Sequence, residues 1–168
     1  MILLKPFVKE HFDQLISWAA SEELLMQFAG PAFRFPLTAA QLEQTLADTD
    51  RLCYSVLYVP ANTIIGHAEI HFRDNKTAHL CRILIGEEAY RGKGLGKAIV
   101  QQLLSICFER ENMEQASLNV YSWNLAAISC YQKAGFIQQP ANTRTQQVNN
   151  QTWTTLNMRI NRVNWRNL

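Results

Sequence analysis

Apolar residues recur along the chain with two periods, one typical of helices and the other typical of strands. The clearest helical stripe has the spacing i, i+3, i+4, i+7 and i+8. It consists of Val100, Leu103, Leu104, Cys107 and Phe108. This stripe predicts a helix over residues 98–109, while alternating and β-branched runs elsewhere predict strands. We therefore expect a mixed α/β (α+β) chain.

The remaining elements follow from the same periods and from turn and capping residues. The expected strands are residues 2–7, 54–59, 64–72, 78–85, 116–121, a segment after Phe136, and 153–160. A first helix carries Phe12, Leu15, Ile16 and Ala19 at helical spacing. A second helix starts at Thr38, where Thr38 and Gln41 predict a capping box. Residues 138–152, rich in Asn, Gln and Thr, predict a turn-bearing loop or hairpin tip.

Residues 90–97, Tyr-Arg-Gly-Lys-Gly-Leu-Gly-Lys, connect an apolar strand to the predicted helix over residues 98–109. Glycines let the backbone approach a ligand closely, and the first amides of a helix lack partners within the helix. The helix dipole favours a negative charge there, and Lys93 and Lys97 add positive charge. This segment predicts a binding site for a phosphate or pyrophosphate.

The glycine spacing distinguishes three phosphate-binding patterns. A Walker P-loop would need a glycine in place of Arg91 and a hydroxyl residue in place of Ala98. The dinucleotide-binding fingerprint would need a glycine in place of Lys97. A third pattern, Arg/Gln-x-x-Gly-x-Gly/Ala, is matched in full by Arg91, Gly94 and Gly96.

A second informative block spans residues 118–136. It predicts a strand, an N-cap at Asn124, a short helix, and a glycine C-cap at Gly135. Asn124 and Tyr131 are seven residues apart, so they lie on one helical face. With Ala127 and the Gly135-Phe136 pair, this block and the glycine-rich segment resemble the GNAT superfamily of acyl-CoA-dependent N-acyltransferases.

The resemblance covers the whole chain and implies one N-acetyltransferase domain over residues 1–168. It implies the GNAT fold, a mixed twisted sheet of about six to seven strands flanked by about four helices. It also implies acetyl-CoA as cosubstrate and direct transfer to a primary amine in a ternary complex. The pattern is similar to the branch that includes the Rim-type ribosomal-protein and spermidine acetyltransferases.

The resemblance assigns the coenzyme to backbone-rich positions. Residues of the glycine-rich loop would hold the pyrophosphate: Arg91, Gly92, Lys93, Gly94, Leu95, Gly96 and Lys97. The backbone of Ile83 and Ile85 would pair with the pantetheine amides, much as an added strand would. Asn124, which caps its helix in any case, would also contact the coenzyme.

Tyr131 would be the general acid that protonates the departing coenzyme A thiolate. A phenol with a pKa near 10 keeps its proton at neutral pH, which suits that role. The alternative is an aromatic side chain that only packs on a short helix.

Glu69 is the candidate to take or relay the proton of the amine, or to hold a cationic acceptor. It shares one strand face with His67 and His71, while the opposite face is apolar. The alternative for Glu69 is a solvated strand face.

Two other chemistries are weighed and set aside. The His67-x-Glu69-x-His71 trio could chelate a metal, but the Pro-Cys-x-x-Cys of His-x-Glu deaminases is missing, so no metal is expected. Cys130 beside Tyr131 suggests an acyl-thiol intermediate. No histidine lies nearby in sequence to activate it, so direct transfer is preferred.

Composition limits the partners. A net charge of +2 on 168 residues gives no strong attraction to nucleic acid, and no membrane-spanning run or signal peptide is expected. Four cysteines without C-x-x-C spacing indicate thiols of a cytoplasmic protein.

The acceptor is the part that the sequence leaves open. The aromatic-rich residues 24–36 would line the acceptor side, which in this family serves small-molecule amines and protein or peptide N-termini. A homodimer is left open as well. The rival function is a coenzyme A-binding module without significant catalysis.

Overall fold

The computed structural model of the chain describes residues 1–167, which form two compact units. The first unit comprises residues 1–71 and 81–95, and the second comprises residues 72–80 and those from 96 onward. Strand β4 (Thr77–Ile85) belongs to both, because the boundary falls after Leu80.

The first unit pairs three N-terminal strands with the second half of β4 in the order β1-β2-β3-β4. The strands are β1 (Ile2–Pro6), β2 (Arg51–Tyr58) and β3 (Thr63–Phe72). Adjacent strands from β1 to β3 run antiparallel. The helices of this unit are α1 (Phe12–Trp18), α2 (Glu22–Ala29) and α3 (Ala39–Leu46). Short 3-10 turns are η1 (Lys9–His11), η2 (Gly30–Ala32), η3 (Val59–Ala61) and η4 (Glu88–Tyr90).

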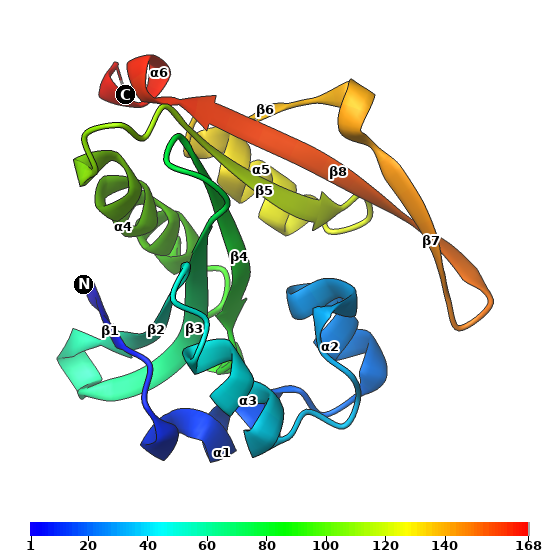
Figure 1. Cartoon of the computed structure of the whole chain (residues 1–168). Helices are drawn as coiled ribbons and strands as arrows, with labels where there is room; N and C mark the ends of the chain where they lie inside the picture. Colours follow the sequence, from blue (N-terminus) through cyan, green and yellow to red (C-terminus); the bar gives the residue numbers. More distant parts are fainter. Residues whose placement is uncertain (168) are drawn as a thin grey trace. The chain divides into compact units, whose positions relative to one another are not determined.

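The core of the first unit is a cluster of apolar side chains from α1, α2, α3 and the segments joining them. It consists of Phe7, Phe12, Leu15, Ala19, Leu25, Phe33, Leu37 and Leu42. Helices α1 and α3 lie in contact, as Figure 1 shows. Phe33 and Leu37, which come from the predicted acceptor segment and the residues just after it, are therefore anchored in the core rather than free.

Helix α3 is capped differently from the predicted capping box. Thr38 Oγ1 accepts a hydrogen bond from the backbone N–H of Gln41, which is the expected half of the box. The Gln41 side chain does not complete it. Its amide instead donates to the carbonyl oxygens of Arg34 and Pro36 and accepts from the Arg34 N–H. Gln41 thereby fixes the loop before the helix.

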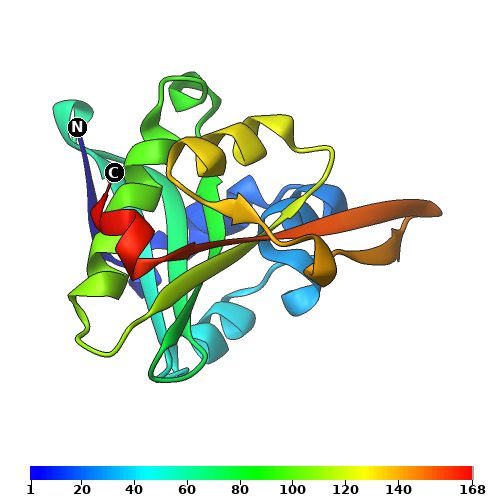
Figure 2. The same cartoon turned by 90° about the horizontal axis from the view of Figure 1, so that it is seen from above.

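The second unit is built around a long antiparallel pair. Its strands are β5 (Gln115–Tyr121), β6 (Ile137–Gln138), β7 (Arg144–Val148) and β8 (Gln151–Asn161), with the first half of β4. The order is β4-β5-β8-β6, with β7 also on β8. β8 pairs with β5 and then continues past it to carry β7 (Figure 2). Its helices are α4 (Leu95–Glu109), α5 (Leu125–Lys133) and α6 (Arg162–Arg166), with η5 (Pro140–Asn142).

The apolar stripe predicted for the helix over residues 98–109 is confirmed. All five of its side chains are buried on α4. Residues 138–152 do contain a hairpin tip, formed by Asn149 and Asn150, which both have positive φ. Along residues 1–167 there are eight strands and six α-helices, slightly more than predicted. The additional elements are α2, β7 and α6. No helix in the described part of the chain is long and apolar enough to cross a membrane.

Candidate active site

The glycine-rich loop is fastened to the end of β4 by Arg91. Its guanidinium Nε donates to the carbonyl oxygen of Ile85, and its Nη2 donates to that of Gly86, each over 2.9 Å. Gly86 packs directly against Trp18. A Cβ built on Gly86 would lie 2.0 Å from the indole ring. The Arg91 side chain therefore fixes the loop to β4. The backbone of the loop remains the part that could bind a ligand.

Replacing Arg91 by lysine is expected to weaken acetyl-CoA binding about tenfold. Lysine keeps the charge but cannot make both hydrogen bonds, each worth about 0.5–1.5 kcal/mol, so the loop loses its fixed conformation. Calorimetric titration with acetyl-CoA measures the change, with the exposed Arg73→Lys as control. An Arg91→Lys affinity equal to that of the parent would show that the loop needs no such fastening.

The loop itself contains two glycines in the left-handed region of backbone space. Gly92 and Gly94 have φ values of 72° and 75°, which L side chains rarely adopt. A Cβ built on either residue would meet nothing within 4 Å, so this side of the loop is open. Helix α4 begins directly afterwards at Leu95, and the first amides of a helix have no intrahelical acceptors. A loop of this kind is compatible with an anion, and pyrophosphate binding by residues 91–97 stays a prediction.

The last glycine of the loop lies against the helix that carries Tyr131. A Cβ at Gly96 would approach Cys130 Sγ to 3.3 Å, tighter than ordinary contact. The glycine therefore lets α4 approach α5 at this point with no side chain between them. The structure brings the two sequence blocks together at this point, although 34 residues separate Gly96 from Cys130.

Helix α5 is capped as predicted. Asn124 Oδ1 accepts from the Ala127 N–H over 3.2 Å, and Gly135 follows the helix with a φ of 90°. Tyr131 is partly buried, with its ring 6.3 Å from that of Phe136. Burial raises the pKa of the Tyr131 phenol, so it stays protonated at neutral pH. A protonated phenol at this position can act as an acid.

Strand β4 has an irregular backbone at Arg82, just beyond the end of its pairing with β5. Its ladder with β5 ends at the pair Leu80 and Leu118. Arg82 has a φ of 51°, an uncommon conformation for a residue with a long side chain. Beyond it, Ile83 and Ile85 are partly exposed, and their pairing with pantetheine stays a prediction. No sequence signal marked Arg82, because its residue type gives no sign of a left-handed conformation.

Glu69 is buried with no measurable exposure, so the alternative of a solvated strand face is wrong. Arg82 Nη1 donates to both of its carboxylate oxygens, over 2.9 and 3.1 Å. Arg51 Nη1 donates over 2.8 Å, and His67 Nε2 lies 2.9 Å from Oε1. A carboxylate with these partners is fully ionised and already saturated with donors.

The partners of Glu69 also decide its acidity. Burial raises the pKa of Glu69, but the hydrogen bond from His67 and the charges of Arg82 and Arg51 outweigh it and lower the pKa to about 2. Such a group is a weak base. The structure thus gives Glu69 the role of holding two arginines more readily than that of accepting a proton from an amine.

Glu69→Gln is expected to cost about 3–5 kcal/mol of folding stability, because it leaves two buried guanidinium groups without their carboxylate. The pKa of Glu69 falls from 4.5 to about 2 on folding. The contribution of ionised Glu69 to folding stability is therefore complete at pH values above its pKa in the unfolded chain. It is lost as pH falls from about 4.5 to 2. Denaturant unfolding at pH 7 and pH 3 measures this.

The difference in the free energy of unfolding between the parent and Glu69→Gln should therefore be smaller at pH 3 than at pH 7. Glu10→Gln makes the same chemical change at an exposed position and should show little effect at either pH. A difference that is equally large at both pH values would contradict a strongly acidic Glu69.

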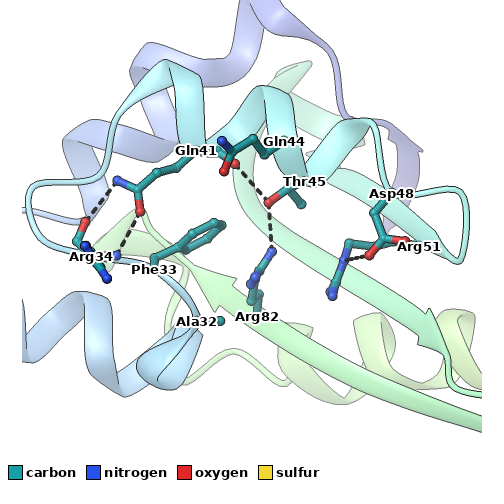
Figure 3. A pocket seen from close by; sticks show the side chains of 9 residues that line it. All are labelled: Ala32, Phe33, Arg34, Gln41, Gln44, Thr45, Asp48, Arg51 and Arg82. Carbon is teal, nitrogen blue, oxygen red and sulfur yellow. Dashed lines mark hydrogen bonds and ion pairs between the residues drawn. The ribbon is translucent and has the colours of Figure 1, made fainter.

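The two arginines that hold Glu69 also line a cavity of about 580 Å³ in the first unit. Figure 3 shows Arg34 at one end and Arg51 at the other, with Arg82 and Phe33 between them. Arg82 Nη1 also donates to Thr45 Oγ1, and its Cζ lies 3.8 Å from the centre of the Phe33 ring. Of residues 24–36, Ala32, Phe33 and Arg34 line this cavity, and its use by an acceptor stays a prediction.

These features define a protein with a glycine-rich loop at the start of one helix and a tyrosine on the neighbouring helix. Comparison with known families agrees. Residues 14–136 match the family model "Acetyltransferase (GNAT) family". The chain therefore belongs to the GNAT family, and it is an acetyl-CoA-dependent N-acetyltransferase.

Individual relatives are distant. An N-acetyltransferase 9-like protein of Nematostella vectensis is 23% identical over 146 residues, which cover 80% of this chain and 74% of that protein. Spermidine N-acetyltransferase from Vibrio cholerae, solved with CoA and spermine, superposes with a TM-score of 0.80 at 17% identity, over 98% of this chain and 97% of that one. Aminoglycoside acetyltransferase AAC(6')-Ib, solved with coenzyme A and kanamycin, gives 0.74 at 20% identity, over 99% and 98%. The predicted GNAT fold is confirmed.

Within residues 1–167, no group of three or more His, Cys, Asp or Glu side chains is arranged to hold a metal ion. His67, the first residue of the trio considered above, contacts Glu69 and packs edge-on against Phe7.

Proposed function

We propose that the chain transfers the acetyl group of acetyl-CoA directly to a primary amine in a ternary complex. The loop of residues 91–97 holds the pyrophosphate, and the backbone of Ile83 and Ile85 pairs with pantetheine. The observation that carries this proposal is the contact of Gly96 with Cys130, the residue beside Tyr131. It connects the helix start that faces the coenzyme with the helix that supplies the acid.

In the chemical step, the neutral amine nitrogen attacks the acetyl carbonyl carbon, and the carbon–sulfur bond breaks. Tyr131 gives its proton to the departing thiolate sulfur. The nitrogen loses a proton to solvent, and Tyr131 regains one. Because burial raises the pKa of Tyr131, the phenol is protonated at the start of each turnover.

An acyl-thiol route through Cys130 is chemically less suited. Burial raises the pKa of the Cys130 thiol above its usual value, and the charges of Lys133 and Lys97 do not outweigh that effect. The thiolate needed for attack is therefore scarce at neutral pH. Direct transfer needs no such nucleophile.

The proton of the amine is proposed to leave through water rather than directly to Glu69. Glu69 is saturated with donors and has a pKa of about 2, so it would hold a proton poorly. We propose that it acts on the reaction by fixing Arg51 and Arg82 at the cavity.

A thiol-release assay with acetyl-CoA and a panel of amines tests the function. The panel includes spermine and kanamycin, ligands of the structural neighbours, with amino acids, peptides with free N-termini and their amides. We expect amine-dependent thiol release and an acetylated product by mass spectrometry. Acetyl-CoA binding without amine-dependent release by any member would instead identify a coenzyme A-binding module.

A further inference from the structure

The cavity of the first unit has an excess of positive charge. Its charged lining consists of three guanidinium groups, from Arg34, Arg51 and Arg82, and one carboxylate, from Asp48. Glu69, which lies behind the lining, neutralises one further charge. A net positive charge therefore remains.

The arginines retain donors that the protein does not use. Arg51 makes its hydrogen bonds through Nε and Nη1, and Arg82 makes its bonds through Nη1. Within residues 1–167, the Nη2 groups of both have no acceptor, and the guanidinium of the exposed Arg34 has none at all. A guanidinium offers five N–H groups in a fixed fork that matches a carboxylate.

The two inner guanidinium groups are fixed before any ligand arrives. Their side chains are 13% and 7% exposed, for Arg51 and Arg82, and both are bonded to the same buried carboxylate of Glu69. Phe33 and Thr45 further restrain Arg82. Binding an anion here would cost little side-chain ordering.

From these contacts we infer that the amine acceptor carries a carboxylate, which the cavity binds through Arg34 and the free N–H groups of Arg51 and Arg82. The inference rests on the proposed function. A polyamine has no group for these donors, and its positive charges are repelled by them. The same charges favour the neutral form of an acceptor amine, which is the form that attacks.

The test uses matched acceptors that differ only in the anionic group. Each is an amine with a free carboxylate, such as an amino acid or a short peptide, compared with its carboxamide, and spermidine is the cationic comparison. In the thiol-release assay, kcat/KM of the best carboxylate acceptor should exceed that of its carboxamide by about tenfold or more.

The variant Arg34→Gln changes an exposed side chain whose guanidinium has no protein partner, so folding should survive. It should raise KM for the carboxylate acceptor about tenfold, hold kcat, and leave the carboxamide unchanged. Arg34→Lys should recover part of the loss. The control Arg73→Gln removes an exposed charge on the turn before β4 and should change neither acceptor.

The outcomes separate this inference from the proposed function. Equal or better acetylation of carboxamides or spermidine overturns the inference and leaves the proposed function standing. An Arg34→Gln enzyme that prefers the carboxylate acceptor as strongly as the parent does has the same consequence. If no amine is acetylated, the proposed function fails. Calorimetry of the carboxylate ligands with the CoA-bound protein then tests the inference alone. Binding by the parent that is lost in Arg34→Gln supports the inference, and no binding by the parent overturns it.

Discussion

Replacing Gly94 by glutamate is expected to abolish acetyl-CoA binding while the chain still folds. Gly94 has a φ of 75°, and a Cβ there meets nothing within 4 Å, so the new side chain enters open space without a clash. It enters on the open side of the loop, where the pyrophosphate is proposed to lie, and places a carboxylate against it. The left-handed conformation adds strain of about 1–2 kcal/mol. Calorimetry should detect no binding at millimolar acetyl-CoA.

Gly30→Glu is the matched control for this prediction. Gly30 also has a positive φ, 62°, and a Cβ there meets nothing within 4 Å, so the same substitution brings the same charge into open space at a position that favours glycine. It should leave acetyl-CoA affinity unchanged. Circular dichroism and thermal unfolding of both variants show whether they fold. A folded Gly94→Glu protein that binds acetyl-CoA as the parent does would show that the loop does not bind the coenzyme.

Local sequence patterns predicted the parts of the site that depend on local backbone. The loop of residues 91–97 and the capped helix at Asn124 each follow from residues close together in the chain. Their glycines and cap specify the backbone conformation by themselves, so the pattern was sufficient. The structure places Gly96 close to Cys130, so the two blocks lie near each other, and their shared role in binding the coenzyme stays a prediction.

The surroundings of Glu69 could not be predicted in the same way. Alternation on β3 placed Glu69 and His67 on one face, but the two arginines come from β2 and β4. Arg51 is 18 residues away and Arg82 is 13 residues away. Periodicity within one strand says which face a side chain occupies, and it does not say what covers that face. The contribution of Arg51 and Arg82 to the lining of the cavity was missed for the same reason.

Helix α2 was missed although local signals mark it. It has eight residues, and only Leu25 is buried. Ser21 Oγ accepts from the Leu24 N–H, Glu22 and Glu23 lie in the first turn, and Gly30 follows the last residue. The aromatic-rich residues 24–36 therefore begin within a helix, and only the residues after Ala29 form the turn and loop that lead to α3.

Tyr131→Phe is expected to lower kcat by about 10²–10⁴ and to leave acetyl-CoA affinity nearly unchanged. The substitution removes one hydroxyl and keeps the ring that lies near Phe136, so α5 should keep its packing. Without the phenol proton, the thiolate must leave unprotonated or take a proton from water. Steady-state kinetics gives kcat, and calorimetry gives the acetyl-CoA affinity.

Tyr58→Phe deletes the same hydroxyl from a tyrosine on β2, whose ring packs on Tyr90, and it should keep the parental kcat. The pH profile separates acid catalysis from packing. Since burial raises the pKa of Tyr131, the parent should hold kcat into the alkaline range until the phenol ionises. Tyr131→Phe should lack that alkaline fall. A Tyr131→Phe enzyme as fast as the parent on its best amine would show that the phenol only packs, and protonation of the thiolate would then fall to water.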